Sequence, residues 1–301
     1  MSNTDRGYRF DGGRIGFLLA HGLGGTPTEM RYLALGLSKA GYTVSVPQLA
    51  GHGGTEDDIR KSTWQDWYGT LDRELTQLKS ECDLVFVCGL SGGAILSLNL
   101  AADRGSDVAG VMLLAPTFRL DGWSIPWYAR YFDLVLTKSF ANLIPFVERE
   151  PYGIKDHRLR HMVAEALANQ DTDGEAGLYC TPGGTILELR WLTDVVKRKL
   201  PGIKLPIMIM HPRFDDRASL NNTAYLQRHL GGLVETVVLD DCYHIVTIDR
   251  QRDIVLERVK RFASYELAAR GVGADPTPQS LPAPRRADEA AEGGSSNIAA
   301  A

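Results

Sequence analysis

Residues 85–104, VFVCGLSGGAILSLNLAADR, contain the most informative turn of the chain. An apolar run breaks at glycines around one serine, and a helical pattern follows. Gly89-Leu90-Ser91-Gly92-Gly93 fits the G-x-S-x-G pattern, in which a tight turn between a strand and a helix exposes a serine hydroxyl. Gly89 and Gly93 leave room for the neighbouring chain. We therefore predict that Ser91 is a nucleophile rather than part of an ordinary Gly-Ser turn.

Short apolar runs alternate with amphipathic stretches on both sides of this turn, which is typical of an α/β fold with a mainly parallel sheet flanked by helices. The predicted strands cover residues 14–20, 42–46, 84–88, 108–114, 205–210 and 234–239. The predicted helices cover residues 28–40, 64–79, 94–104 and 254–267.

The domain organisation follows from where this alternation holds. We expect one α/β core over residues 7–118 and 201–268, and an inserted, mostly helical cap over residues 119–200, because an insertion of this length usually covers a site. Residues 269–301 are dense in Pro, Gly, Ala and Ser, with almost no large apolar side chains, and are predicted to be a disordered tail.

The composition excludes several classes of protein. The chain has 301 residues, 44% of them hydrophobic, and a net charge of -4, so no basic excess points to nucleic acid. Charged residues near the N-terminus and the lack of an apolar run of about 18 residues predict a cytoplasmic protein without stable membrane insertion. Four scattered cysteines indicate neither a disulfide framework nor a zinc site. The oligomeric state is not indicated.

A serine hydroxyl is a poor nucleophile at neutral pH, so a base is needed. His244, in LDDCYHIVTID, follows the last predicted strand and precedes the last predicted helix. We expect it at the same edge of the sheet as Ser91 and predict that it is the base. The histidines at positions 157, 161 and 229 lie in helix-like sequence and are expected at the surface or in packing.

The acid that orients the base is expected after the strand at 205–210, where residues 211–219 read HPRFDDRAS. Two carboxyl groups stand next to each other there. Because successive side chains in an extended chain face opposite ways, only one of them is expected to contact the imidazole. We favour Asp215 and keep Asp216 as the alternative.

A glycine-rich turn, LLAHGLGGTP at residues 18–27, follows the first predicted strand. We predict that the backbone N–H groups of Leu23 and Gly92 form an oxyanion hole, the second of them at the positive end of a helix. A phosphate loop is disfavoured, since neither G-x-G-x-x-G nor G-K-[ST] is present. His21 is expected to shape this turn through hydrogen bonds.

Four segments together resemble the bacterial carboxylesterases and monoacylglycerol lipases of the α/β-hydrolase superfamily. These segments are LLAHGLGGTPTEM, VPQLAGHGGTEDDIRKSTWQDW, VFVCGLSGGAILSLNLA and DDCYHIVTIDRQRD. The resemblance implies the α/β-hydrolase fold, a triad of Ser91, Asp215 and His244, oxyanion amides from Leu23 and Gly92, and a cap over an acyl pocket, with no cofactor. Gly92 stands where this family usually has a larger residue.

Large apolar residues crowd the start of the insertion: Trp123, Ile125, Trp127, Tyr128, Tyr131, Phe132, Leu134 and Val135. We predict that Trp123, Trp127 and Tyr128 bind the acyl group of the substrate. The alternative is that this apolar face packs the cap onto the core.

The predicted function is hydrolysis of short to medium acyl esters or monoacylglycerols, which are small-molecule substrates, through an acyl-enzyme on Ser91. A thioesterase or an acyltransferase would use the same three residues. A non-catalytic binding protein on a hydrolase scaffold is a further alternative, because a fold does not fix a function. Metal catalysis is not expected, since no ligand spacing such as H-E-x-x-H occurs.

Overall fold

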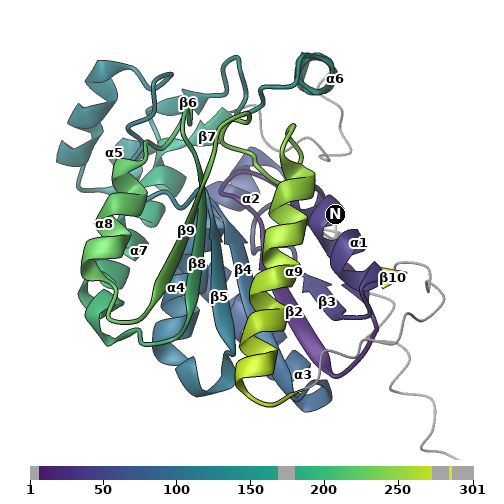
Figure 1. Ribbon diagram of the computed structural model, residues 1–301. Helices are drawn as coiled ribbons and strands as arrows, with labels where there is room; N and C mark the ends of the chain where they lie inside the picture. The colour runs from purple at the N-terminus through teal and green to yellow at the C-terminus, as the bar shows by residue number, and fades with distance from the viewer. Residues whose placement is uncertain (1–6, 169–179, 273–284, 287–301) are drawn as a thin grey trace, which may run out of the picture.

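The computed structural model describes residues 7–168, 180–272 and 285–286, and within them the core is one mixed sheet with helices on both faces (Figure 1). The strand order is β10-β1-β3-β2-β4-β5-β8-β9. The strands of this sheet are β1 (Tyr8–Phe10), β2 (Ile15–Ala20), β3 (Thr43–Val46), β4 (Leu84–Leu90), β5 (Gly110–Leu114), β8 (Ile207–Pro212), β9 (Val234–Leu239) and β10 (Arg285–Arg286). The α/β class predicted from the alternation is confirmed.

The sheet is parallel from β3 to β9 and antiparallel at its other edge. In the centre, Ile15 of β2 pairs with Leu84 of β4, and the register continues to Ala20 and Gly89. The sequence-based prediction missed β1, which runs antiparallel to β3. A strand of three residues is too short for its alternation to be recognised.

Helices cover both faces of this sheet. The α-helices are α1 (Arg31–Lys39), α2 (Glu56–Lys61), α3 (Trp64–Glu81), α4 (Gly92–Asp103), α5 (Lys138–Ala141), α6 (His157–Ala168), α7 (Gly183–Lys199), α8 (Asn221–His229) and α9 (Arg252–Ala269). Short 3-10 helices are η1 (Pro27–Met30), η2 (Gly105–Asp107), η3 (Trp127–Leu134) and η4 (Leu200–Gly202). Capping boxes explain where two of the helices begin, since Thr55 with Asp58 caps α2 and Thr63 with Asp66 caps α3.

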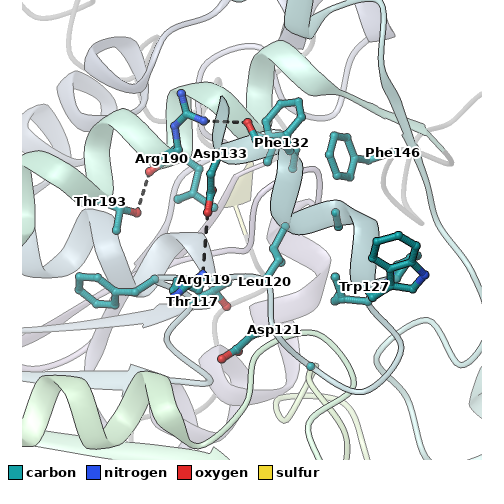
Figure 2. A pocket seen from close by; sticks show the side chains of 17 residues that line it. Thr117, Arg119, Leu120, Asp121, Trp127, Phe132, Asp133, Phe146, Arg190 and Thr193 are labelled. Atoms are coloured by element: carbon teal, nitrogen blue, oxygen red, sulfur yellow. Dashed lines mark hydrogen bonds and ion pairs between the residues drawn. The ribbon is translucent and has the colours of Figure 1, made fainter. Parts of the chain in front are cut away.

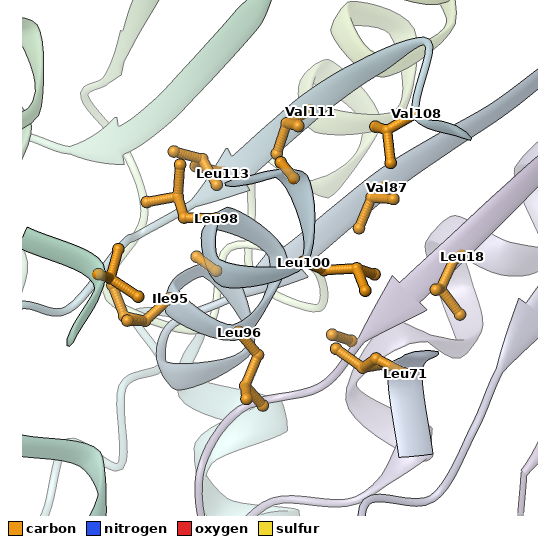
Figure 3. Packing of buried hydrophobic residues seen from close by; sticks show 14 of the residues in the cluster. Leu18, Leu71, Val87, Ile95, Leu96, Leu98, Leu100, Val108, Val111 and Leu113 are labelled. Carbon is orange, nitrogen blue, oxygen red and sulfur yellow. The ribbon is translucent and has the colours of Figure 1, made fainter. Parts of the chain in front are cut away.

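The core consists of two buried layers because successive residues of a strand face opposite sides. Val85 and Val87 of β4 belong to the layer that includes α3, α4 and α7, part of which Figure 3 shows around α4. Phe86 and Cys88 of the same strand belong to the layer formed with α1 and α9. The strand β4 is thus buried on both faces, and its carboxyl end, where Ser91 follows, is fixed by packing from both sides.

The segment predicted as the cap contains η3, α5, α6 and the antiparallel hairpin of β6 (Pro145–Val147) and β7 (Cys180–Pro182). In Figure 1, α5, α6 and this hairpin lie above the sheet, at the end to which the nucleophile turn points. The last helix of the segment, α7, packs on α4, and Leu192 and Val196 join the core layer there. Of the described elements in this segment, α5, α6, β6 and β7 thus lie above the sheet, whereas α7 packs on the core.

None of the helices in the described ranges is both long enough and apolar enough to cross a membrane. Of the predicted tail, only residues 269–272 and 285–286 are described, and the short β10 pairs with β1. The disorder predicted for 273–284 and 287–301 lies outside the described residues.

Candidate active site

Ser91 occupies a strained turn between β4 and α4. Its φ is 55°, which lies in the left-handed region that residues other than glycine rarely adopt. Its N–H donates to the carbonyl of Leu114 at 2.8 Å, which ties the turn to the end of β5. A Cβ at Gly89 would collide with the backbone of Gly93, and one at Gly93 would collide with the carbonyl of Ala20. These two glycines let the strand and the helix approach closely enough to expose the serine hydroxyl.

Three side chains form a continuous chain of hydrogen bonds at this turn. His244 Nε2 lies 2.8 Å from Ser91 Oγ, and His244 Nδ1 lies 2.8 Å from Asp215 Oδ2 and 3.0 Å from Asp215 Oδ1. Because a carboxylate only accepts hydrogen bonds, Nδ1 carries the proton and Nε2 is free to accept from the serine. His244 and Asp215 are buried. The arrangement is that of a nucleophile, a base and an orienting acid.

Asp215 is held as a charged acceptor. Its Oδ1 accepts the N–H groups of Arg217 and Ala218, each at 2.8 Å. Burial alone would raise the pKa of Asp215, but its interactions with His244 and His211 and the hydrogen bond from the Ala218 N–H lower it below its ordinary value. His211, whose Nε2 lies 3.5 Å from Asp215 Oδ2, is a buried neighbour that sequence reasoning missed.

The neighbouring carboxylate of Asp216 faces main-chain groups instead of the imidazole ring. Its Oδ1 accepts the N–H of His244 at 3.2 Å, and its Oδ2 accepts the N–H of Gly153 at 3.1 Å. The two acids left open by the sequence therefore have different partners, and only Asp215 contacts the ring.

The two predicted oxyanion donors lie side by side next to Ser91. A Cβ placed on Gly92 would lie 3.2 Å from Leu23 Cβ and 3.5 Å from Leu23 N. His21, two residues before Leu23, anchors this turn to the neighbouring loop, since its Nε2 accepts the N–H of Leu49 at 3.1 Å. Burial, with His52 close by, lowers the pKa of His21 to about 3, so this ring is neutral. The Leu23 turn therefore lies against Gly92, the residue that follows the serine.

A cavity of about 570 Å³ opens beside Ser91 and His244 and extends beneath the cap. Most of its walls are apolar, with Leu23, Ile125, Tyr128, Phe132, Phe146 and Ile186 among them. A volume of this size accommodates a small organic molecule of medium length.

A second cavity of about 310 Å³ adjoins the first and shares Thr117, Leu120 and Phe132 with it (Figure 2). On its polar side, Arg190 donates to the carbonyl of Phe132 at 2.9 Å, and Arg119 lies 3.8 Å from Asp133. The two cavities together make an apolar region that leads away from the serine.

The three aromatic residues predicted to bind the acyl group lie in different places. Tyr128 lines the larger cavity. Trp127 lines only the smaller one and is 70% exposed, at the edge of the view in Figure 2. Trp123 lines neither cavity, and its indole N–H donates to the carbonyl of Phe214 at 3.0 Å.

Polar groups at the cavity wall had no recognisable spacing in the sequence. Arg217 forms a two-pronged ion pair with Glu148, at 2.6 and 3.2 Å, and both line the larger cavity. Thr117 Oγ1 lies 3.2 Å from Ser91 Oγ. Glu29, which lies on η1 and does not line this cavity, accepts the N–H of Gly22 at 3.0 Å, and burial raises the pKa of this carboxyl group. These residues come from separate segments of the chain.

Within the described ranges, no group of three or more His, Cys, Asp or Glu side chains is placed to hold a metal ion. The reactive groups described above are all side chains and backbone amides of the chain itself.

The chain is similar to several known hydrolases. The model of the family Hydrolase_4, described as serine aminopeptidase S33, matches residues 14–251. A thermostable monoacylglycerol lipase from Bacillus sp. (strain H-257) is 29% identical over 254 residues, which cover 84% of this chain and 91% of the relative. A carboxylesterase from Bacillus subtilis (strain 168) is 24% identical, covering 86% of this chain and 96% of that protein. A solved structure from the pair LipS and LipT, two metagenome-derived lipolytic enzymes, is similar with a TM-score of 0.72 at 27% identity, covering 86% of this chain and 97% of that one.

Proposed function

The chain belongs to the Hydrolase_4 family, the serine aminopeptidases of group S33, and on this premise we propose that it is a serine hydrolase that cleaves carboxylic esters. The preferred substrates are short to medium acyl esters or monoacylglycerols. Relatives that match this chain over most of its length are named as a lipase and a carboxylesterase, which supports an ester rather than a peptide as the substrate.

The observation that carries the proposal is the line of hydrogen bonds from Ser91 through His244 to Asp215. In the proposed reaction, Ser91 Oγ attacks the ester carbonyl while His244 Nε2 takes the hydroxyl proton. Asp215 stabilises the imidazolium that forms. The N–H groups of Leu23 and Gly92 donate to the carbonyl oxygen as it becomes negative.

The remaining steps complete the acylation of Ser91 and then regenerate the enzyme. The imidazolium of His244 gives its proton to the departing alkoxide, and an alcohol leaves while the acyl group stays bound to Ser91 as an ester. Water attacks this acyl-enzyme while the same imidazole takes its proton, and the imidazolium then returns the proton to Ser91 Oγ as the carboxylic acid leaves. The apolar cavity beneath the cap supports an acyl chain as the group it holds, with Tyr128 on its wall.

The decisive experiment is intact-mass analysis after exposure to a fluorophosphonate probe. The wild type is expected to gain one phosphonyl group, and Ser91→Ala is expected to gain none. Ser80→Ala is the matched control, because Ser80 is an exposed serine on α3 that bonds only to its own helix, and it is expected to react like the wild type.

A panel of p-nitrophenyl esters of increasing acyl length, matched acyl thioesters and monoacylglycerols then identifies the substrate. Hydrolysis of oxygen esters that is lost in Ser91→Ala supports the proposal. Activity on thioesters without activity on matched oxygen esters would assign a thioesterase instead. A folded wild type that neither reacts with the probe nor hydrolyses any ester would favour a binding protein on this scaffold.

A further inference from the structure

Asp216 is a buried carboxylate that joins three separate parts of the chain. Its side chain accepts the N–H of His244 and the N–H of Gly153, as described above. Its main-chain carbonyl accepts two hydrogen bonds from Ser124, from N at 3.0 Å and from Oγ at 2.7 Å. One residue therefore connects the loop that carries the histidine with two segments of the predicted cap.

The contact between Gly153 and the histidine loop is unusually close. The carbonyl of Gly153 accepts the N–H of Ile245 at 2.8 Å, and Gly153 has a φ of 73°. A Cβ at this position would lie 2.8 Å from Ile245 Cγ1 and 3.3 Å from His244 Cβ. A side chain at residue 153 would therefore push directly on the histidine.

We propose that Asp216 is a positioning residue that fixes the imidazole of His244 relative to Ser91 by fastening the histidine main chain to the cap. The proposal rests on the hydrolytic function inferred above. A buried carboxylate that accepts two backbone N–H groups forms strong, directional bonds, and a neutral side chain of the same shape cannot make both. Since a displacement of about 1 Å in a reacting group costs about 10²-fold in rate, this loop needs such a fixed point.

Asp249 provides a matched comparison because it joins the same two loops without touching His244. This buried carboxylate accepts the N–H of Tyr243 at 2.7 Å, of Lys155 at 2.8 Å and of Asp156 at 2.9 Å. Like Asp216, Asp249 is buried and accepts hydrogen bonds from backbone N–H groups. Unlike Asp216, it bonds to Tyr243, the residue before the histidine, and not to His244.

The experiment compares Asp216→Asn with Asp249→Asn. In Asp216→Asn an amide NH₂ group replaces one of the two carboxylate oxygens. Because this NH₂ group faces a main-chain N–H, one of the two hydrogen bonds to His244 and Gly153 is lost. We expect kcat for p-nitrophenyl butyrate and the rate of fluorophosphonate labelling to fall by about 10²-fold, with KM nearly unchanged. The low-field proton resonance of the His244 to Asp215 bond should shift in this variant. In Asp249→Asn the thermal midpoint should fall, while kcat and the resonance stay close to the wild type.

Two results would overturn the proposal: a wild-type kcat in folded Asp216→Asn, or an equal loss of kcat in Asp249→Asn. If Asp216→Asn does not fold, amide hydrogen exchange in the wild type decides. The amides of His244 and Gly153 should be protected to the same degree, and a freely exchanging His244 amide would refute the role of Asp216. A wild type that lacks hydrolytic activity would instead contradict the proposed function, and the exchange result would be unaffected by it.

Discussion

Leu23 lies in the turn after β2 and Gly92 begins α4, yet they are so close that a Cβ added to residue 92 would lie 3.2 Å from the Leu23 Cβ. This distance is shorter than an ordinary van der Waals contact, so a larger residue at position 92 requires Leu23 to shift by a few tenths of an ångström. Both residues supply an N–H group to the proposed oxyanion hole, and the absence of a side chain at 92 therefore bears on the geometry of both donors.

The first prediction concerns this contact. Gly92→Ala is expected to lower kcat by roughly tenfold, and Gly92→Leu by more. Both losses stay below or near the 10²–10³-fold that removal of an oxyanion donor costs, because the N–H groups are displaced rather than deleted. The measurement is kcat for a p-nitrophenyl ester. Gly105→Ala is the control, since a Cβ there meets only Leu205 Cδ1 at 3.9 Å. Equal kcat in Gly92→Ala and the wild type would show that Leu23 can shift without disturbing the oxyanion hole.

Asp215 gives a second prediction that separates the two adjacent acids. Asp215→Asn is expected to lower kcat by about 10⁴-fold, because an amide cannot stabilise the imidazolium and favours the wrong tautomer of His244. Nearly full activity in this variant would move the orienting role away from Asp215. Since Asp216→Asn is expected to lose about 10²-fold, the two variants rank the adjacent acids by their roles.

The charge of Asp215 is also expected to make the free energy of unfolding depend on pH. The pKa of Asp215 in the folded protein lies below its ordinary value of 3.8. Its charge therefore stabilises the fold at pH values above 3.8, and this contribution is lost as the pH falls through the lower folded pKa. We expect the difference in free energy of unfolding between the wild type and Asp215→Asn to shrink between neutral pH and pH 3, as measured by urea titration. A difference that does not change with pH would mean that Asp215 is not preferentially charged in the folded state.

The outcome for the core elements shows what the sequence can predict. The sequence predicted the strands as short apolar runs and the helices as longer stretches, most of them amphipathic. The predicted elements are β2, β3, β4, β5, β8, β9, α1, α3, α4 and α9. The turn at Ser91 was predicted because its geometry requires glycines at fixed spacing, and the sequence shows them directly.

The site was less predictable wherever irregular loops decide the direction of a side chain. The difference between Asp215 and Asp216 depends on which amides of Gly153, Ala218 and His244 come near, and no period in the sequence encodes these contacts. The cap shows the same limit. In η3, Tyr128 lines the larger cavity and Trp127 the smaller one, although both side chains are more than half exposed. A crowded apolar stretch therefore did not distinguish Tyr128 from Trp127.

Another prediction concerns the ion pair between α5 and α7. Lys138 Nζ lies 2.8 Å from Glu188 Oε1 and also donates to the carbonyl of Ser62, while Glu188 is 3% exposed. Lys138→Met leaves a buried carboxylate without its cation and is expected to lower the free energy of unfolding by about 2 kcal/mol, less than for a fully buried pair because Lys138 is partly exposed.

The double variant Lys138→Met/Glu188→Gln tests the cause. Because it removes the unpaired charge, it is expected to recover most of the lost stability in urea unfolding. If the double variant is as unstable as Lys138→Met alone, the stability lost in Lys138→Met comes from lost packing and not from the unpaired charge of Glu188.

The last prediction follows from two buried histidines beneath the Leu23 turn. The rings of His21 and His52 pack edge to face with centroids 5.1 Å apart, and His52 also packs on Trp67 at 5.5 Å. Burial lowers the pKa of His52 to about 4 and that of His21 to about 3. Between these values and the ordinary 6.5, the unfolded chain binds protons that the folded chain does not. The free energy of unfolding therefore falls as the pH falls through this range, by about 1.4 kcal/mol per pH unit for each histidine.

The variant His52→Phe isolates one of these two contributions. Phenylalanine keeps an aromatic ring against Trp67 but cannot take up a proton, so the slope of the free energy of unfolding against pH should decrease by about 1.4 kcal/mol per pH unit between pH 4.5 and 6. His229→Phe is the control for the substitution itself, because it replaces an exposed histidine on α8. Equal slopes in His52→Phe and the wild type would mean that His52 takes up its proton in the folded protein as readily as in the unfolded chain.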